Sequence, residues 1–329
     1  IMVGRSLKVT SFSLFLICLV ACGSSENSES NMDEGTVDAG GMGDAAAPGD
    51  SDLIEDAGAG DMTMADAFVP LPEVPILSSG ALGIVWRPDH RRFEVRHDDA
   101  LRLELPLSGF QVGLVEEVSD RGNYDPYYVH DGNPATTPAN LRWVSAEAPR
   151  VQVGNATQFV ELDFPGVGTG RLAFIPTADR RVAVSFTPPD GEVAYMRIQP
   201  HAGSEEAFYG LGEVFDHVNH RGKVRAMQLE LDTEIESAIN EAHVPIPVIY
   251  GHHGWGLFVE SYRPGVFAVA TETDEKIDVI FGTGVASAEG LQFHLFTEDH
   301  PLDLTQHYFG ITGDPLLPAE WAYGPWVWR

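Results

Sequence analysis

The sequence predicts an all-β protein, built as a large antiparallel β-sandwich. Apolar and polar residues alternate with period two in five runs, which is typical of strands with one buried face. These runs are 92–97, 101–107, 159–164, 181–186 and 291–296. Six further strand-like runs lie at 194–199, 227–232, 247–251, 254–261, 265–271 and 276–282. A helical period is found at Leu302–Phe309, and about a dozen short strands separated by Gly, Pro, Asn and Asp indicate two packed sheets.

Residues 1–22 have the pattern of a secretory signal peptide. A short cationic stretch precedes the uncharged run Val9–Ala21. A membrane-spanning helix needs about twenty apolar residues, so this run is too short to span. The letters "LVAC" ending at Cys22 resemble a bacterial lipobox, which predicts lipidation of Cys22 and a membrane anchor. Gly23 after that Cys, rather than Asp, resembles outer-membrane sorting and predicts an outer-membrane lipoprotein.

Loss of the leader would remove Cys18, and lipidation would use Cys22, the only two cysteines of the chain. The mature protein would then have no disulfide, and packing alone would stabilise its core.

The next segment, 23–77, is predicted to be a disordered acidic tether. Its composition is dominated by Gly, Ala, Asp, Ser and Met, and no Lys or Arg occurs between Lys8 and Arg87. Thirteen Asp or Glu within 23–75 supply −13 of the chain's formal charge of −29. Calcium binding was weighed as an alternative, but the acids do not follow the spacing of a calcium loop. Such acidity also argues against a nucleic-acid partner.

The sandwich is expected to occupy 78–315, and the stretch 316–329 differs from it. Its letters "LLPAEWAYGPWVWR" carry several aromatic residues up to the last position. A natural carboxyl terminus is usually polar, because exposed Trp side chains favour aggregation. The expectation is a truncated reading frame, and Met2 is a better start than Ile1.

Several candidate sites favour a structural interpretation. "YGLGEVF" at 209–215 lacks the third Gly of a dinucleotide loop. His252 and His253 are adjacent, and neighbours on a strand point to opposite faces, so turn residues are favoured over metal ligands. The acid pairs Glu213 with Asp216 and Asp232 with Glu234 are close in sequence, but exposed or turn-capping acids are favoured over a catalytic pair.

Four segments in order resemble glycoside hydrolase family 31. They are "FYGLGE" at 208–213, the Arg221-Gly222 that follows, "VPIPVIYGHHGWGLFVES" at 244–261 and "GDPLLPAEWAYGPWVWR" at 313–329. The family is alpha-glucosidase-like, and its members include alpha-xylosidases and related retaining, exo-acting enzymes. The resemblance covers about residues 80–329 and is most specific over 208–329.

The resemblance implies a galactose-mutarotase-like sandwich with a structural corner at 208–222, in which Gly210 and Gly212 allow tight turns and the rings pack inward. It also implies that the segment after the corner reaches towards the sugar. There "QLELD" stands where the family has L-W-N-T-D, so Asp232 is the residue that would contact substrate, while the Trp, Asn and Thr are replaced.

By the same resemblance, 316–329 begins a (β/α)8 barrel, with Trp326 and Trp328 as residues that line the sugar pocket or pack in the core. The nucleophile and the acid/base would be Asp residues further along, so no catalytic residue, metal or other cofactor is expected within this chain, and the chain alone is expected to be inactive.

The sequence thus predicts the amino-terminal part of a retaining hydrolase of alpha-linked glucosides or xylosides, with a carbohydrate substrate and a lipid anchor as its partners. A non-catalytic carbohydrate-binding or scaffold lipoprotein remains an alternative, as does a family member whose barrel lacks the acids. Sequence beyond Arg329 would discriminate between them.

Overall fold

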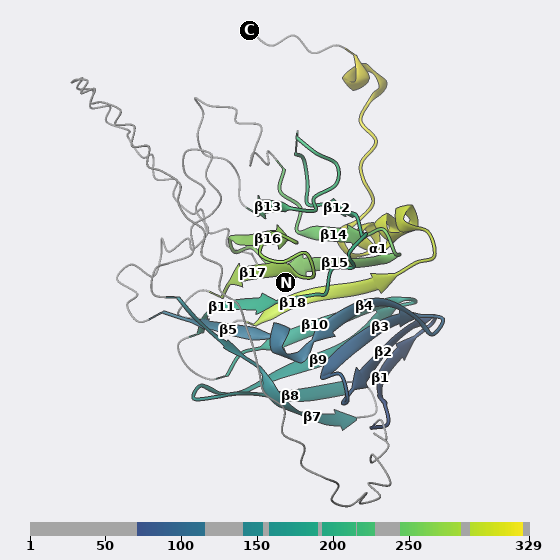
Figure 1. Cartoon of the computed structure of the whole chain (residues 1–329). Helices are drawn as coiled ribbons and strands as arrows, with labels where there is room; N and C mark the ends of the chain where they lie inside the picture. Colours follow the sequence, from purple (N-terminus) through teal and green to yellow (C-terminus); the bar gives the residue numbers. More distant parts are fainter. Residues whose placement is uncertain are drawn as a thin grey trace, which may run out of the picture. The chain divides into compact units, whose positions relative to one another are not determined.

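The computed structural model describes residues 71–115, 141–153, 158–189, 193–214, 216–227, 244–283 and 290–324, all within one compact unit. In these residues the strands form three antiparallel sheets (Figure 1). Alternation of buried and exposed side chains along most strands explains why these segments pair with one face towards a common core.

The first sheet is a meander of four strands. Its order follows the chain: β1 (Val74–Ser79), β2 (Leu82–Arg87), β3 (Arg92–His97) and β4 (Ala100–Pro106). Asp98 and Asp99 form the turn between β3 and β4 with φ of 45° and 65°, a left-handed conformation that Asp tolerates better than most residues. Ile84, Phe93 and Leu105 are buried, so one face of this sheet covers the core.

The second sheet has eight strands in the order β12-β14-β15-β18-β10-β9-β8-β7. Their bounds are β7 (Glu147–Val153), β8 (Gln158–Phe164), β9 (Gly168–Ala178), β10 (Arg181–Thr187), β12 (Phe208–Gly210), β14 (Val248–Gly251), β15 (Trp255–Glu260) and β18 (Leu291–Thr297). Late strand β18 lies between β10 and β15, and its residue Gln292 is directly opposite both Glu260 and Ser185. A strand late in the chain therefore joins the two halves of this sheet.

The third sheet has six strands in the order β13-β16-β17-β11-β5-β6. Their bounds are β5 (Gln111–Leu114), β6 (Arg142–Ser145), β11 (Val193–Ile198), β13 (Lys223–Ala226), β16 (Gly265–Val269) and β17 (Ile277–Gly282). A short 3-10 helix, η1 (Leu107–Gly109), leads from the first sheet into β5. Since β12 and β13 belong to different sheets, the chain crosses between sheets in the few residues that separate them.

One apolar core unites the three sheets. Phe93 on β3 packs against Phe110 and Phe174, with ring centroids 5.8 Å from each. Phe281 of the six-stranded sheet and Phe293 of the eight-stranded sheet belong to the same buried cluster. Large buried rings of this kind contribute much of the apolar area that stabilises a domain without disulfides.

A short helical segment covers the outer face of the eight-stranded sheet. It comprises η2 (Pro301–Asp303) and α1 (Leu304–Thr312), followed further on by η3 (Glu320–Tyr323). Helix α1 contacts β15 and β18 (Figure 1). Its residue Leu304 is buried with Phe258 and Phe296. Gly313 ends the helix with φ of 100°, a conformation that favours glycine.

The all-β prediction is confirmed, with three corrections of detail. The described strands form three sheets rather than two. Strand β1 begins at Val74, four residues before the expected start of the sandwich at 78, and α1 extends to Thr312 rather than Phe309. The predicted strand 227–232 lies almost wholly outside the described residues. Among the described residues, no helix is both long and apolar enough to cross a membrane.

Candidate functional site

The chain leaves β12 through three consecutive residues with positive φ. Gly210, Leu211 and Gly212 have φ of 103°, 60° and 91°. A Cβ on Gly210 would overlap with the carbonyl oxygen of Val248, and one on Gly212 with that of Val244. Only glycine combines this conformation with such close backbone approach. The prediction that both glycines permit a tight structural corner is confirmed.

The two aromatic rings of the corner lie differently. Phe208 is fully buried, with its ring centroid 6.1 Å from that of Trp255 and the guanidinium of Arg221 5.7 Å from its centroid. Tyr209 is 37% exposed. The expectation that the rings pack inward therefore holds for Phe208 and is wrong for Tyr209, because successive side chains of β12 point to opposite faces.

Four polar side chains fix the corner to β13, and we call them the corner cluster: Asp216, His220, Lys223 and Arg225. Arg225 donates to Asp216 across 2.5 Å and, through Nε, to His220 Nδ1 across 3.2 Å. His220 Nε2 donates to the carbonyl oxygen of Gly210 across 2.8 Å. Lys223 Nζ lies 3.4 Å from Asp216. Because Nε2 faces a carbonyl oxygen, which can only accept, and Nδ1 faces an N–H, which can only donate, His220 is neutral with its proton on Nε2.

Burial and neighbouring charges shift the pKa values of Asp216 and His220 in the corner cluster. Burial works to raise the pKa of the Asp216 carboxyl, but hydrogen bonds from Arg225 and from the His217 backbone, with the charge of Arg225, outweigh it, so this pKa is lowered. Burial is the largest effect on His220 and lowers its pKa; the bond to Gly210 opposes this, the Arg225 charge adds to the lowering, and the Asp216 charge opposes it least, so this pKa is lowered. Both shifts favour the ionised carboxyl and the neutral imidazole in the folded state.

His220 should make stability fall as the pH is lowered from about 7.5 to 5.5. The unfolded chain binds the imidazole proton near an ordinary pKa of about 6.5, whereas the folded chain binds it only at lower pH. Because the unfolded state then holds more protons, acid favours unfolding. The slope of the unfolding free energy against pH, measured by urea titration, should be smaller in His220→Gln. The exposed His217→Gln is the control and should keep the wild-type slope; equal slopes in wild type and His220→Gln would contradict the prediction.

The two described ends of the segment that carries Asp232 are tied to different parts of the sandwich. At one end, the backbone N–H of Met227 donates to Gly265 across 2.7 Å. At the other, the carbonyl oxygen of Val244 accepts from the N–H of Glu213 across 3.1 Å. The segment therefore leaves the sandwich beside the beginning of β16 and rejoins it at the corner.

The site residues predicted from the sequence lie outside the described residues. This applies to Asp232, Trp326, Trp328 and the predicted lipidation residue Cys22. Their proposed roles stay predictions.

The acid pair Glu213 and Asp216 does not form a catalytic site in the structure. Asp216 is bound to Arg225 and Lys223, and Glu213 is exposed. Retaining glycosidases need two carboxyls facing each other across a sugar. The structural interpretation of these two acids is supported, while Asp232 and Glu234 lie outside the described residues.

His252 and His253 occupy the turn between β14 and β15, as predicted, but their rings are close together. The ring centroids are 4.0 Å apart, and the buried carboxyl of Glu206 lies nearby, with Oε1 3.5 Å from His253 Nδ1. The expectation of opposite faces and no third group fails, because the alternation rule applies to strands and not to turns. Glu206 is 46 residues earlier, so no local pattern indicated it.

The hydrogen bonds of this turn disfavour a metal ion. Glu206 accepts from Trp255 Nε1 across 2.7 Å and from the N–H of Gly203 across 3.3 Å, and His252 Nδ1 accepts from the N–H of Ala207 across 2.9 Å. Two His and one Glu could bind zinc, and their donor atoms lie within 4.8 Å of one another. However, His252 Nδ1 accepts from Ala207, which places the ring proton of a neutral His252 on Nε2, so neither nitrogen offers a lone pair to a metal. The group therefore serves to hold the turn against Trp255.

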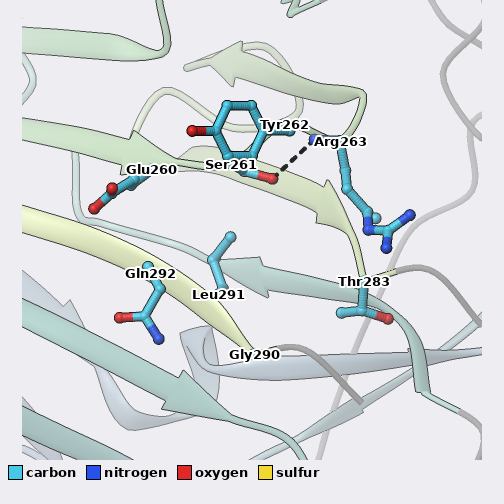
Figure 2. A pocket seen from close by; sticks show the side chains of 9 residues that line it. Glu260, Ser261, Tyr262, Arg263, Thr283, Gly290, Leu291 and Gln292 are labelled. Carbon is cyan, nitrogen blue, oxygen red and sulfur yellow. Dashed lines mark hydrogen bonds between the residues drawn. The ribbon is translucent and has the colours of Figure 1, made fainter. Parts of the chain in front are cut away.

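A hollow of about 520 Å³ lies where the end of β15 meets the beginning of β18 (Figure 2). Its polar lining includes Glu260, Ser261, Arg263 and Gln292, and Tyr262 is its aromatic residue. Figure 2 shows Glu260 and the turn with Tyr262 on one side, and Gln292 with Leu291 on the other. The sequence did not reveal this hollow, because its two sides are about thirty residues apart and meet only through pairing of β15 with β18.

Known proteins similar to this chain share a family. Residues 124–267 match the family model described as the glycosyl hydrolase 31 N-terminal galactose mutarotase-like domain. An alpha-xylosidase of Lactiplantibacillus pentosus, XylQ, is 28% identical over 168 residues, covering 50% of this chain and 21% of the relative. An isomaltosyltransferase of Sporosarcina globispora is 24% identical over 238 residues, covering 70% and 20%. The matches thus span about a fifth of the length of these relatives.

Among solved structures, a sulfoquinovosidase of family 31 from E. rectale, in complex with an aza-sugar inhibitor, is similar with a TM-score of 0.47 and 16% identity. The matched region covers 68% of this chain and 33% of the sulfoquinovosidase chain.

Proposed function

We propose that this chain, which carries the amino-terminal galactose mutarotase-like domain of glycoside hydrolase family 31, is the front part of a retaining hydrolase of alpha-linked glycosides. The family-model match over 124–267 carries the proposal, because it includes the corner of β12 and β13 together with the strands that support it. Relatives with the names alpha-xylosidase and alpha-glucosidase 2 support an alpha-glucoside or alpha-xyloside as the substrate.

The proposed reaction is a double displacement at the anomeric carbon. One carboxylate attacks this carbon while a second, protonated carboxyl donates its proton to the departing glycosidic oxygen. Water, deprotonated by the second carboxylate, then breaks the glycosyl ester and restores both groups. Both carboxyls belong to a catalytic barrel and not to the sandwich, so we expect residues 1–329 to have no hydrolase activity alone.

The sandwich would contribute to substrate binding rather than to bond cleavage. In this proposal Asp232 contacts the sugar, from a segment that rejoins the sandwich at the corner. Trp326 and Trp328 would lie beside the sugar pocket, where aromatic faces stack on sugar rings. Acid, base and nucleophile suffice for this chemistry, so the proposal needs no cofactor.

The enzyme would be anchored in the cell envelope as an outer-membrane lipoprotein. Lipidation of Cys22 supplies the anchor. The acidic segment 23–77 would extend by self-repulsion and separate the sandwich from the membrane surface.

The full-length protein should release nitrophenol from an aryl alpha-glucoside or alpha-xyloside, while residues 1–329 should release none.

The hydrolase activity should sediment with washed membranes in the wild type and move to the soluble fraction in Cys22→Ala. Asp232→Ala, assayed with the same substrates, should raise KM because a sugar contact is lost.

No release across a panel of aryl alpha-glycosides would refute the hydrolase proposal and favour a non-catalytic lipoprotein. Hydrolase activity in the soluble fraction of the wild type would refute the proposed lipid anchor but not the proposed hydrolase activity.

A further inference from the structure

We infer that the hollow beside Tyr262 is a binding site for a neutral oligosaccharide, with stacking on the Tyr262 ring and hydrogen bonds to Glu260 and Gln292. Nothing in the family match or in the relatives assigns a role to these residues. The choice of alpha-linked probes below rests on the proposed function, but binding itself does not depend on hydrolysis.

Tyr262 is presented to solvent on a constrained turn. Its relative exposure is 105%, so neither ring face is packed against the protein. Ser261 Oγ accepts from the N–H of Arg263 across 3.1 Å, and Pro264 follows with its fixed φ. The next residue, Gly265, lies so close to the Phe281 ring that a Cβ there would overlap with it. The backbone of the turn is therefore constrained, so binding needs to order the ring but not the turn that carries it.

An exposed aromatic side chain alone would mean little, since single exposed apolar residues are common. Tyr262 is significant because polar side chains face the same hollow. Glu260 and Gln292 are opposite each other in the β15–β18 ladder, so their side chains project from the same face at a fixed spacing. Figure 2 shows them on the two strands that border the hollow.

Neighbouring residues orient these two polar groups. A Glu260 carboxylate oxygen lies 3.1 Å from His294 Nε2, and Gln292 Nε2 donates to Ser185 Oγ across 2.7 Å. A carboxylate has two oxygens and an amide offers both donors and an acceptor, so each group has hydrogen-bonding capacity for a ligand besides its bond to the protein. Adjacent hydroxyls of a sugar both donate and accept, which matches this combination.

Charge and size favour a neutral sugar over other ligands. Glu260 and Arg263 supply one formal charge of each sign to the lining, which offers no net attraction to a phosphate or an ammonium. The lining combines polar side chains with apolar surface, and a sugar likewise combines hydroxyls with apolar ring faces. A hollow of about 520 Å³ falls within the usual range for small-ligand sites, roughly 300–1,000 Å³.

Affinity electrophoresis of this chain tests the inference. Migration through native gels that contain dextran or glycogen should be retarded relative to plain gels, and titration calorimetry with isomaltotriose and maltotriose should give saturable binding for at least one. Tyr262→Ala should weaken binding about tenfold, through loss of ring stacking. Tyr262→Phe should keep most of the affinity, and Gln292→Ala should weaken it by a smaller factor.

Leu302→Ala removes an apolar side chain that is 73% exposed and lies outside the hollow, so it is the matched control and should bind as the wild type does. Circular dichroism should show all variants folded, since Tyr262 makes no buried contact. No retardation and no saturable binding would overturn the inference, as would binding that Tyr262→Ala leaves unchanged. Loss of hydrolysis in the full-length protein with binding retained would refute the proposed function and not this inference.

Discussion

Arg225→Met is expected to lower the free energy of unfolding by about 3 kcal/mol or more. The Arg225 side chain is 2% exposed and pairs with Asp216, which is 16% exposed. Its removal leaves a mostly buried carboxylate with Lys223 and the His217 N–H as its remaining partners, and deprives His220 Nδ1 of its donor. Breaking a buried pair from one side costs more than the pair contributes, because the remaining charge stays buried. Urea unfolding of both proteins measures the difference.

Lys276→Met is the matched control. Lys276 pairs with Glu272 at the surface, and such pairs contribute about 0–1 kcal/mol. The double variant Arg225→Met with Asp216→Asn should lose less unfolding free energy than the two single variants together, because it leaves no unpaired buried charge. A loss in Arg225→Met no larger than that in Lys276→Met would show that the corner cluster does not stabilise the corner.

The sequence predicted strands well where one face is buried and the other is not. Strands β3, β8, β10 and β18 alternate apolar and polar residues, and all were expected within one or two residues. Strand β2, "LGIVWR", has four buried side chains among six, so it shows no clear alternation and was missed. The partition into three sheets depends on which strands pair, and β18 pairs with β10 more than a hundred residues earlier.

Sites were harder to predict because they depend on long-range neighbours. Asp216 was correctly judged a structural acid, although its partner Arg225 was not identified. Glu206 and Tyr262 gave no local signal, because what distinguishes them is Trp255 and the β15–β18 ladder respectively. Asp232 was assigned by resemblance to a family motif, so its role depends on parts of the enzyme other than the described sandwich.

Trp255→Ala is expected to lower the free energy of unfolding by about 3–5 kcal/mol. Trp255 is fully buried in the main core and packs against Phe208, which opens the corner. Truncation removes most of this packing and also the N–H that Glu206 accepts, which leaves a buried carboxylate with one fewer donor. The unfolding free energy in guanidinium chloride should show the loss.

Two companion variants separate packing from hydrogen bonding. Trp255→Phe keeps an aromatic ring but loses the indole N–H, so its cost should be intermediate. Gly251→Ala should also destabilise, because a Cβ there would overlap with both Trp255 Nε1 and Glu206 Oε1. Trp321→Ala is the control, because Trp321 is 75% exposed and its loss should change stability by about 0.5 kcal/mol or less.

Equal stability of Trp255→Ala and Trp321→Ala would contradict a core role for Trp255. A Trp255→Phe variant as stable as the wild type would show that the bond to Glu206 contributes little, and the turn at His252 and His253 would then depend on packing alone. In the double variant Glu206→Gln with Trp255→Phe, the amide of Gln carries no charge, so no unpaired charge stays buried. Its free energy of unfolding should therefore fall less than that of Trp255→Phe alone.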